Sequence, residues 1–392
     1  MDEELLTQAR ASILKSVGWL RAHEKEIVSM DDFSAHYKAP YLWAAVGDPV
    51  KARYYADLMR DRYLQPDGDF RTSPAEKGYR HLPCSPANRY VYPNGWVIVG
   101  LRKMGYYGLA RRGMEFVRRF QSPQWGGFCS RYDAATGRVD PEYMDSSSTS
   151  SAGLALLSCG HIEDARRAGG FLLRLLAAQP DPRRYYYSSW RAGVGLMTDV
   201  GTDEDQNSVR GRKQFCLKAE ADALGELTWL IGKPMKFLAK LYDETGEKQY
   251  LNGSIQLFDF FPRLGEGKWK NLASCKVMWA GSELYRHTGD KRFAETAERL
   301  LREFFELQDA SGAFLHSLWH KQVEDQPLAL NLDNVQELCA EMTDAILDLQ
   351  GEPVPESATG ATRDLPSREC VDFREVRHEP TYTSEEIGAG PK

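Results

Sequence analysis

One loop pattern recurs along this chain and limits what the chain can fold into. The stretch QSPQWGGF, which begins at Gln121, follows an apolar-periodic run and joins a glutamine, turn residues and an aromatic residue. Related stretches are QPDGDF (65–70), QPDPRRYYY (179–187) and QDASGAF (308–314). Each glutamine follows a turn glycine by 16 to 19 residues, and these glycines are Gly47, Gly105, Gly160 and Gly289. Such a period indicates a chain built from repeated supersecondary units.

Each unit is typical of a helical hairpin. A first helix ends at the glycine, a second helix of four to five turns follows, and a loop closed by an aromatic residue completes the unit. A fifth hairpin over 234–261 keeps the turn glycine, Gly246, but lacks the glutamine. With a first helix at about 3–23 and a last one at 334–350, the chain holds about twelve helices. We therefore predict an all-α fold, an (α/α)6 barrel in which the first helix completes the outer layer and the last helix completes the inner one.

The two helices of a pair differ in composition. First helices, such as GWVIVGL, are apolar and rich in small residues, whereas second helices, such as DKRFAETAERLLREFFEL, carry charge on one face. We therefore expect first helices to form the inner ring of a single domain over residues 1–350. Residues 351–392 are rich in Pro, Gly, Glu and Ser, which predicts a disordered tail. The polar stretch 200–214 predicts either a lid or a surface insertion.

Charge and composition limit the partners. The net charge of -6 provides no basic surface for nucleic acid or an anionic membrane. No run of 18 apolar residues occurs, and the acidic amphipathic start lacks the pattern of a secretory signal. The seven cysteines have no metal-ligand spacing, and their odd number argues against a disulfide framework. We expect a soluble, cytoplasmic protein with reduced cysteines, whose oligomeric state the sequence leaves open.

Polar residues near the ends of inner helices are the candidates for a site in the barrel centre. A charged group on an enclosed helix is costly unless it is paired, liganded or in contact with water. The candidates along the successive inner helices are Lys38 and Tyr41; Asn94 and Trp96; Asp145, Ser148 and Thr149; Glu220, Asp222, Glu226 and Trp229; Lys276 and Trp279; and Glu337 and Glu341.

Several of these residues have a plainer interpretation. Asp145 precedes Ser-Ser-Ser-Thr and fits an N-cap, Asn94 fits a simple helix start, and the tryptophans fit core positions. Glu337 and Glu341 lie one turn apart, which suits two carboxylates converging on a cation but also a solvated face. Lys276 stands in an otherwise apolar helix start, which favours a role in the cavity.

Absent motifs narrow the chemistry further. The sequence has no GxSxG, HExxH, P-loop or Rossmann glycine pattern, and its histidines do not cluster at metal-ligand spacing. Neither DDxxD nor DxDD occurs, which argues against a conventional terpene cyclase.

The loops nevertheless resemble the QW-type repeats of squalene-cyclase-like α/α barrels over most of residues 36–315. The segment NLASCKVMWAGSELYRHTG resembles the helix that carries the essential lysine in noncanonical fungal terpene cyclases of the humulene-synthase type. It places Leu272 four residues before Lys276, where that family has an apolar residue that steers product geometry. YKAPYLWAAVG, YPNGW, DSSSTSSAG and LDNVQE also resemble segments of that group.

The resemblance implies a carbon–oxygen lyase that ionises and cyclises farnesyl diphosphate with Mg²⁺ in an apolar, aromatic-lined cavity. Lys276 and Asp145 would be catalytic. The substrate would be bound by Lys38, Tyr41, Asn94, Trp96, Trp229, Leu272 and Trp279. By position, Asp145, Glu337 and Asn94 would hold the metal.

Two alternatives stay open at this point. In a carbohydrate-active α/α-barrel enzyme, either a glycoside hydrolase or a sugar epimerase, paired carboxylates such as Asp145 and Glu337 would act as acid and base. A catalytically inert binding barrel is the third possibility.

Overall fold

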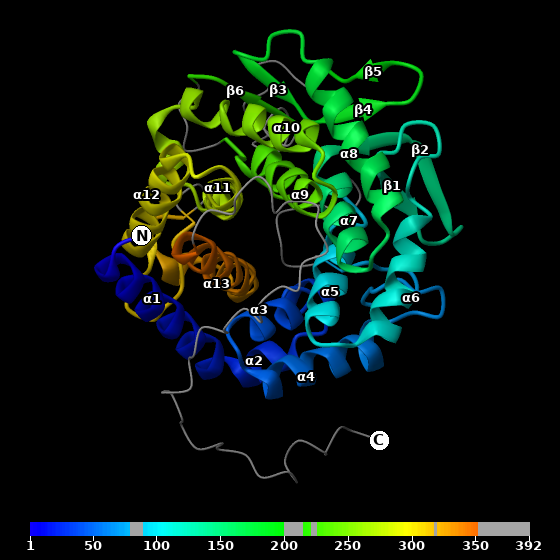
Figure 1. Ribbon diagram of the computed structural model, residues 1–392. Coiled ribbons are helices and arrows are strands. Elements are labelled where there is room, and N and C mark those ends of the chain that lie inside the picture. Colours follow the sequence, from blue (N-terminus) through cyan, green and yellow to red (C-terminus); the bar gives the residue numbers. More distant parts are fainter. Residues whose placement is uncertain (79–88, 200–214, 221–225, 317–319, 352–392) are drawn as a thin grey trace.

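The computed structural model describes residues 1–78, 89–199, 215–220, 226–316 and 320–351, and these residues form two concentric rings of helices (Figure 1). The inner helices are α3 (Ala39–Ala45), α5 (Tyr92–Lys103), α7 (Ser146–Ser158), α9 (Trp229–Thr245), α11 (Cys275–Thr288) and α13 (Leu328–Gln350). The outer helices are α1 (Glu3–Ala22), α4 (Pro49–Leu58), α6 (Tyr107–Arg118), α8 (Ile162–Ala177), α10 (Lys248–Phe258) and α12 (Lys291–Leu307). The short α2 (Glu24–Ser29) follows α1.

The inner ring closes on itself. Each inner helix packs against the next, and α13 packs against both α11 and α3. The helix α1 lies against α12 and α13 and so completes the outer layer. The predicted (α/α)6 barrel is therefore confirmed, including the places of the first and last helices. No helix within the described residues is long and apolar enough to span a bilayer.

The fourth inner helix begins later than the sequence predicts. It starts at Trp229, so Glu220 and Glu226 precede it rather than lie on it, and Asp222 falls outside the described residues. Glu220 has a φ of 59°, which an α-helix of L-residues does not accommodate. The predicted lid or insertion at 200–214 and the predicted tail, apart from Gly351, also lie outside the described residues. The single domain over 1–350 stays a prediction.

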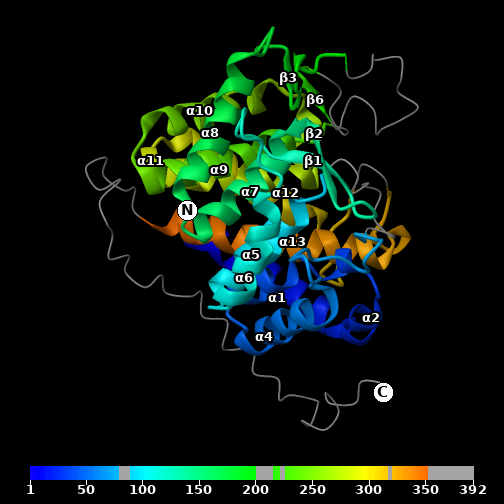
Figure 2. The ribbon, with the colours of Figure 1, turned by 90° about the vertical axis from the view of Figure 1, so that its right-hand side faces the viewer.

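Two small antiparallel sheets accompany the helices, and the helical repeat does not predict them. One sheet has the order β1 (Cys129–Asp133), β2 (Arg138–Asp145), β4 (Ser189–Arg191) and β5 (Gly195–Leu196), and the other pairs β3 (Tyr185–Tyr187) with β6 (Cys216–Lys218). Because β2 ends at Asp145 and α7 begins at Ser146, this sheet lies at the end of the barrel where inner helices start (Figure 2). Most of these strands are too short for a periodic signal.

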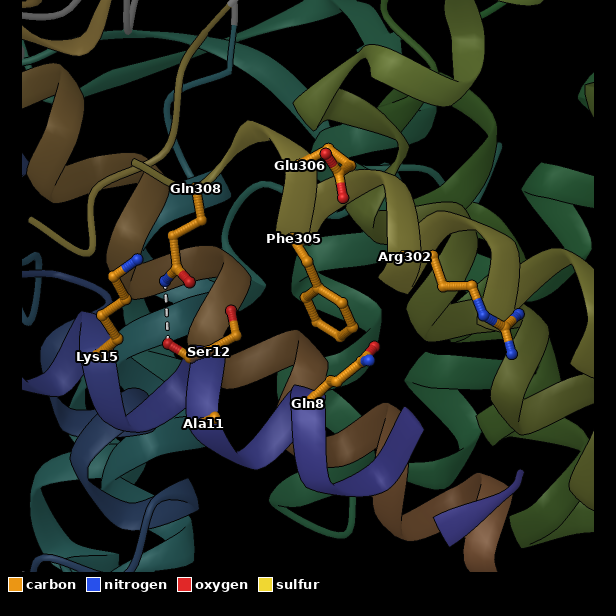
Figure 3. A pocket seen from close by; sticks show the side chains of 8 residues that line it. All are labelled: Gln8, Ala11, Ser12, Lys15, Arg302, Phe305, Glu306 and Gln308. Carbon is orange, nitrogen blue, oxygen red and sulfur yellow. Dashed lines mark hydrogen bonds between the residues drawn. The ribbon is translucent and has the colours of Figure 1, made fainter. Parts of the chain in front are cut away.

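Two of the four loop glutamines, Gln121 and Gln308, fasten their hairpin to the next one, whereas Gln65 and Gln179 hydrogen-bond within their own hairpin. The Nε2 of Gln121 donates to the carbonyl of Gly126 in its own loop at 3.0 Å and to that of Asp164 in α8 at 2.8 Å. The Nε2 of Gln308 donates to the carbonyl of Ser12 in α1 at 2.9 Å (Figure 3). The last loop therefore ties the end of the outer ring to its beginning.

A surface groove lies beside this junction, between α1 and α12 (Figure 3). Its volume is about 470 Å³. It is lined by Gln8, Ala11, Ser12, Lys15, Arg302, Phe305, Glu306 and Gln308. All of these residues belong to the outer layer or its last loop, so the groove is separate from the barrel centre.

Loop and turn glycines have different packing requirements. Gly105, in a helical turn, has a φ of 78°, and an added Cβ would meet nothing within 4 Å. Gly126, in a repeated loop, has a φ of 81°, and an added Cβ would lie 2.3 Å from the carbonyl oxygen of Arg167. Both positions need the left-handed backbone that glycine adopts without strain, but Gly126 also needs the absence of a side chain.

We expect the substitution Gly105→Ala to lower the free energy of unfolding by about 1 kcal/mol, through backbone strain alone. Gly126→Ala should cost about 1 to 3 kcal/mol more, because the loop must move away from α8. Urea unfolding of the two variants measures the difference. Equal losses of stability would show that the close approach of Gly126 to α8 has no energetic importance.

Candidate active site

Six ionisable side chains gather at the barrel centre, and we call them the central cluster. They are Lys38 at the start of α3, Lys233 on α9, Lys276 on α11, and Asp333, Glu337 and Glu341 on α13. The three lysines are 1 to 3% exposed and Glu341 is 0% exposed. The side chains of Asp333 and Glu337 are 19% and 12% exposed, so the cluster reaches solvent through these two carboxylates.

Ion pairs connect three of the four helices. Glu337 contacts the Nζ of Lys276 at 2.5 Å with Oε1 and the Nζ of Lys38 at 3.2 Å with Oε2. Lys38 also pairs with Asp333 at 2.7 Å. Because Asp333, Glu337 and Glu341 are spaced by four residues, they form one stripe along α13 that faces the lysines.

The two glutamates of this stripe have different acidities. Burial would raise the pKa of Glu337, but Lys276 and Lys38 lower it to about 2. Burial raises the pKa of Glu341 to about 7, with Glu337 adding to this effect and Lys276 opposing it. Apart from the thiol of Cys275, neither oxygen of Glu341 has a hydrogen-bond partner among the described residues. Two carboxyls with pKa values pushed apart are typical of an acid–base site.

Lys276 and Lys38 stay positively charged despite their burial. Burial alone would lower the pKa of Lys276, but Cys275, Glu337 and Glu341 raise it well above its usual value. Burial also disfavours the charged form of Lys38, but the nearby carboxylates of Asp333 and Glu337 outweigh the effect of burial and raise the pKa of Lys38. Both ammonium groups can therefore stabilise negative charge that develops beside them.

Aromatic rings form a wall next to the cluster. Trp96 and Trp279 stack with centroids 6.3 Å apart and planes 17° from parallel, and Tyr41 meets Trp96 edge-on at 5.3 Å. Asp344 orients this wall, because it accepts hydrogen bonds from the Nε1 of Trp279 at 3.1 Å and from the hydroxyl of Tyr41. Such a wall suits the apolar face of a ring-shaped ligand.

Of the ten residues given a catalytic, substrate-binding or metal role from the sequence, the structure brings together six: Lys38, Tyr41, Trp96, Lys276, Trp279 and Glu337. The other four make different contacts. Asn94 donates to Asp69 at 2.8 Å and accepts from Lys77. Trp229 packs under the guanidinium of Arg89, 4.2 Å from the ring centroid, and Leu272 is buried in the short helix η8 (Leu272–Ser274).

Asp145 has the plainer role that the sequence also allows. Its Oδ1 accepts from the amides of Ser147 at 2.7 Å and Ser148 at 2.8 Å, which caps α7. A catalytic part for Asp145 stays a prediction. Asp145, Asn94 and Glu337 each contact different partners, and Mg²⁺ at these residues stays a prediction.

A second charged network lies toward the other end of the inner helices, around Glu283 on α11. Its carboxylate contacts Lys236 at 2.8 Å, Lys240 at 2.9 Å and the Nε2 of His287 at 3.0 Å, and it also pairs with Arg286. Among the described residues, Asp243, Glu283 and His287 lie closely enough to hold a metal ion. The cations around Glu283 indicate an ion-pair network instead.

Sequence reasoning missed Lys233, Tyr92 and Asp344. Lys233 lies in the stretch WLIGKPMKFL, where a lysine among apolar residues is the same signal that singles out Lys276. The hydroxyl of Tyr92 reaches the Oε1 of Glu337 at 3.4 Å. Asp344, a charged residue in the last inner helix, carries the same signal, whereas nothing in the local sequence distinguishes Tyr92 from core residues.

By sequence, the chain matches no known protein family and no curated protein. By structure, it is similar to a D-mannose isomerase, with a TM-score of 0.60 and 12% identity over 86% of this chain and 97% of that chain. It is also similar to a cellobiose 2-epimerase from Bacillus thermoamylovorans, with a TM-score of 0.53 and 9% identity over 79% of this chain and 89% of that chain. A third similar structure is a family 76 glycoside hydrolase from a bovine Bacteroides thetaiotaomicron strain, with a TM-score of 0.51 and 15% identity over 79% of this chain and 68% of that chain. At these identities the similarities show the fold.

These findings correct the terpene-cyclase assignment. The solved structures similar to this chain include a sugar isomerase, sugar epimerases and a mannanase, which are carbohydrate enzymes rather than lyases that act on prenyl diphosphates. The barrel centre also differs from an apolar chamber for a carbocation, because it holds the six ionisable groups of the central cluster. The assignment to the humulene-synthase type is therefore wrong. The predicted lyase activity and the predicted substrate, farnesyl diphosphate, are wrong with it.

Proposed function

We propose that this protein is a carbohydrate-active enzyme that isomerises or epimerises a free sugar by proton transfer at the central cluster. The observation that carries the proposal is Glu341, a buried carboxyl group with a pKa of about 7 one turn from ionised Glu337. A group of this pKa can both accept and return a proton at neutral pH. The fold shared with a D-mannose isomerase and a cellobiose 2-epimerase supports a sugar as the substrate class.

The cluster has the groups that such a reaction needs. The carboxylate of Glu341 takes a proton from the carbon beside the carbonyl of an open-chain sugar. Negative charge then develops on the sugar oxygen, where the ammonium of Lys276, 3.9 Å from Glu341, stabilises it. The hydroxyl proton of the deprotonated carbon then moves to the former carbonyl oxygen and the abstracted proton returns to the neighbouring carbon, which gives the isomer. Returning the abstracted proton to the other face of its original carbon, with no transfer between the oxygens, gives the epimer. The stacked rings of Trp96 and Trp279 provide a surface for the substrate.

Glycoside hydrolysis is the second candidate, and the geometry favours it less. Hydrolysis requires two carboxyl groups on either side of the scissile bond. Glu337 and Glu341 lie on the same stripe of α13, and the Lys276 ammonium that contacts both at 2.5 and 3.9 Å occupies the space that the bond would need. Asp145, the other acid that the sequence suggests, caps α7.

Incubation of the purified protein with D-mannose, D-fructose, D-glucose and cellobiose in D₂O tests the proposal. We expect NMR to show interconversion of at least one sugar together with deuterium at the carbon beside the carbonyl. Release of reducing sugar from an α-1,6-mannan, without isotope exchange, would favour hydrolysis instead. If neither occurs, the proposed function is wrong. A parallel sample treated with EDTA and one supplied with Mg²⁺ test the metal prediction.

A cytoplasmic location is also part of this proposal. Five cysteines of the described residues, Cys129, Cys159, Cys216, Cys275 and Cys339, are free thiols. Free thiols are typical of a reducing compartment.

A further inference from the structure

Lys233 differs from the other buried lysines of the inner ring. It is 2% exposed, and among the described residues no carboxylate lies within the 4.0 Å of an ion pair. Lys38, Lys236 and Lys276 are equally buried, but each has a carboxylate at 3.2 Å or less. The Nζ of Lys233 instead lies 4.2 Å from the ring centroids of both Tyr92 and Trp96.

Close packing of α9 on α11 places this amine beside another lysine. An added Cβ at Gly232 would lie 2.6 Å from the backbone of Lys276, so only glycine allows the two helices to approach this closely. Burial and the charge of Lys276 lower the pKa of Lys233 well below its usual value, against the opposing effect of Glu337 and Glu341. The amine is therefore uncharged over a wider pH range than an ordinary lysine, and an uncharged amine is nucleophilic.

We propose that Lys233 is a nucleophile that binds the open-chain carbonyl group of the substrate as an imine. Three features of the geometry support this role. The amine has no carboxylate within ion-pair distance among the described residues, and it lies against the aromatic wall on which the substrate would pack. It also shares the centre with Glu341, whose nearest lysine contact is the ammonium of Lys276 at 3.9 Å. Imine formation is a known function of lysines that are desolvated or placed next to another cation.

Lys233, Glu341 and the substrate supply every proton that the covalent step moves. The nitrogen of Lys233 attacks the carbonyl carbon, a C–N bond forms, and one proton of the amine moves to the carbonyl oxygen. Glu341 in its acid form donates a proton to the resulting hydroxyl group, which leaves as water while the C=N bond forms. The products are a protonated imine, one water molecule and the carboxylate of Glu341. That carboxylate can then take the proton from the carbon next to the imine.

This inference rests on the proposed function and makes it more specific. It restricts the substrate to sugars that expose a free aldehyde or ketone. The protonated imine, which withdraws electrons, makes the C–H proton on the neighbouring carbon easier to remove. It also gives the aromatic pair of Tyr92 and Trp96 a role, because their ring faces exclude water from the amine.

Reduction with borohydride in the presence of D-mannose or D-fructose tests the imine, since it converts the C=N bond into a stable amine. Peptide mass spectrometry should find a reduced hexose on Lys233 in the wild-type protein. Lys233→Met should lose this adduct and its isomerase turnover, with a melting temperature at or above that of the wild type, because an unpaired buried amine is removed. Lys15→Arg, which changes an exposed lysine in α1, is the matched control and should keep both.

The outcomes separate this inference from the proposed function. Adducts only on exposed lysines, or full turnover by Lys233→Met, would overturn the imine while isomerisation by the wild type would still support the enzyme class. An adduct on Lys233 without interconversion of any sugar would support the imine and overturn the isomerase. If Lys233→Met fails to fold, the position of the adduct in the wild-type protein decides the question.

Discussion

Glu341→Gln is expected to lower kcat for sugar interconversion by about 10² to 10⁴-fold, the usual contribution of a positioned acid or base. Glutamine has nearly the same shape as glutamate but cannot accept or return a proton. The folded state should be preserved, because within the described part of the chain neither oxygen of Glu341 holds a hydrogen bond apart from its contact with the Cys275 thiol. Turnover of D-mannose by the variant, compared with that of the wild type, measures the effect.

Glu324→Gln is the matched control, since it changes an exposed glutamate that lies just before α13. It should leave kcat unchanged. Retention of more than about a tenth of the wild-type kcat by Glu341→Gln, well short of the loss expected for a catalytic acid or base, would remove Glu341 from the mechanism.

Glu341→Gln should also change how the free energy of unfolding depends on pH. The pKa of Glu341 is about 7 in the folded protein and 4.5 as its ordinary value, so the fold favours the protonated form. Its contribution to stability is therefore complete below about pH 4.5 and is lost as the pH rises to about 7. Glu337 acts in the opposite direction and in a lower window, because its pKa is lowered to about 2.

Thermal unfolding at pH 5 and pH 7.5 checks whether the contribution of Glu341 to stability falls as the pH rises. The wild type should lose more stability than Glu341→Gln between these two values, because the amide does not titrate. Parallel curves for the two proteins would show that Glu341 has an ordinary acidity in the folded state.

Glu283→Ala is expected to cause the largest loss of stability. The carboxylate is 0% exposed and contacts Lys236, Lys240 and Arg286. Removing it leaves these cations with fewer partners in the barrel interior, although Asp348 still pairs with Lys236 at 3.2 Å. Breaking a buried pair in this way typically costs about 3 to 5 kcal/mol. Urea unfolding should therefore show a much lower midpoint.

The control for this prediction is Glu163→Gln, which breaks an ion pair with Arg166 at the surface. The side chain of Glu163 is 81% exposed, so the change should alter the free energy of unfolding by less than about 1 kcal/mol. Similar losses in the two variants would mean that the network around Glu283 does not stabilise the barrel more than a surface pair does.

Much of the candidate site was within reach of sequence reasoning, but its chemistry was not. A lysine in an apolar inner helix identified Lys276, and the spacing of four residues identified Glu337 and Glu341 as neighbours. The pKa values of these two glutamates differ because Lys276 lies 2.5 Å from Glu337 but 3.9 Å from Glu341. Lys38, which lies about 300 positions away in the sequence, also pairs only with Glu337 of the two. No local pattern carries that information. The resemblance of one lysine-bearing segment led to the wrong substrate for the same reason.

The sequence by itself determined the barrel. Its turn glycines, loop glutamines and amphipathic second helices are local signals in the sequence. They act within one hairpin or on the neighbouring element of the ring, which for Gln308 is the first helix of the chain. Gly126 and Gln121, for example, specify their own loop and its contact with α8. Only the tertiary structure decided which charged residues meet in the centre. The inner helices bring together side chains from α3, α9, α11 and α13, and burial there makes each group's charge depend on its neighbours.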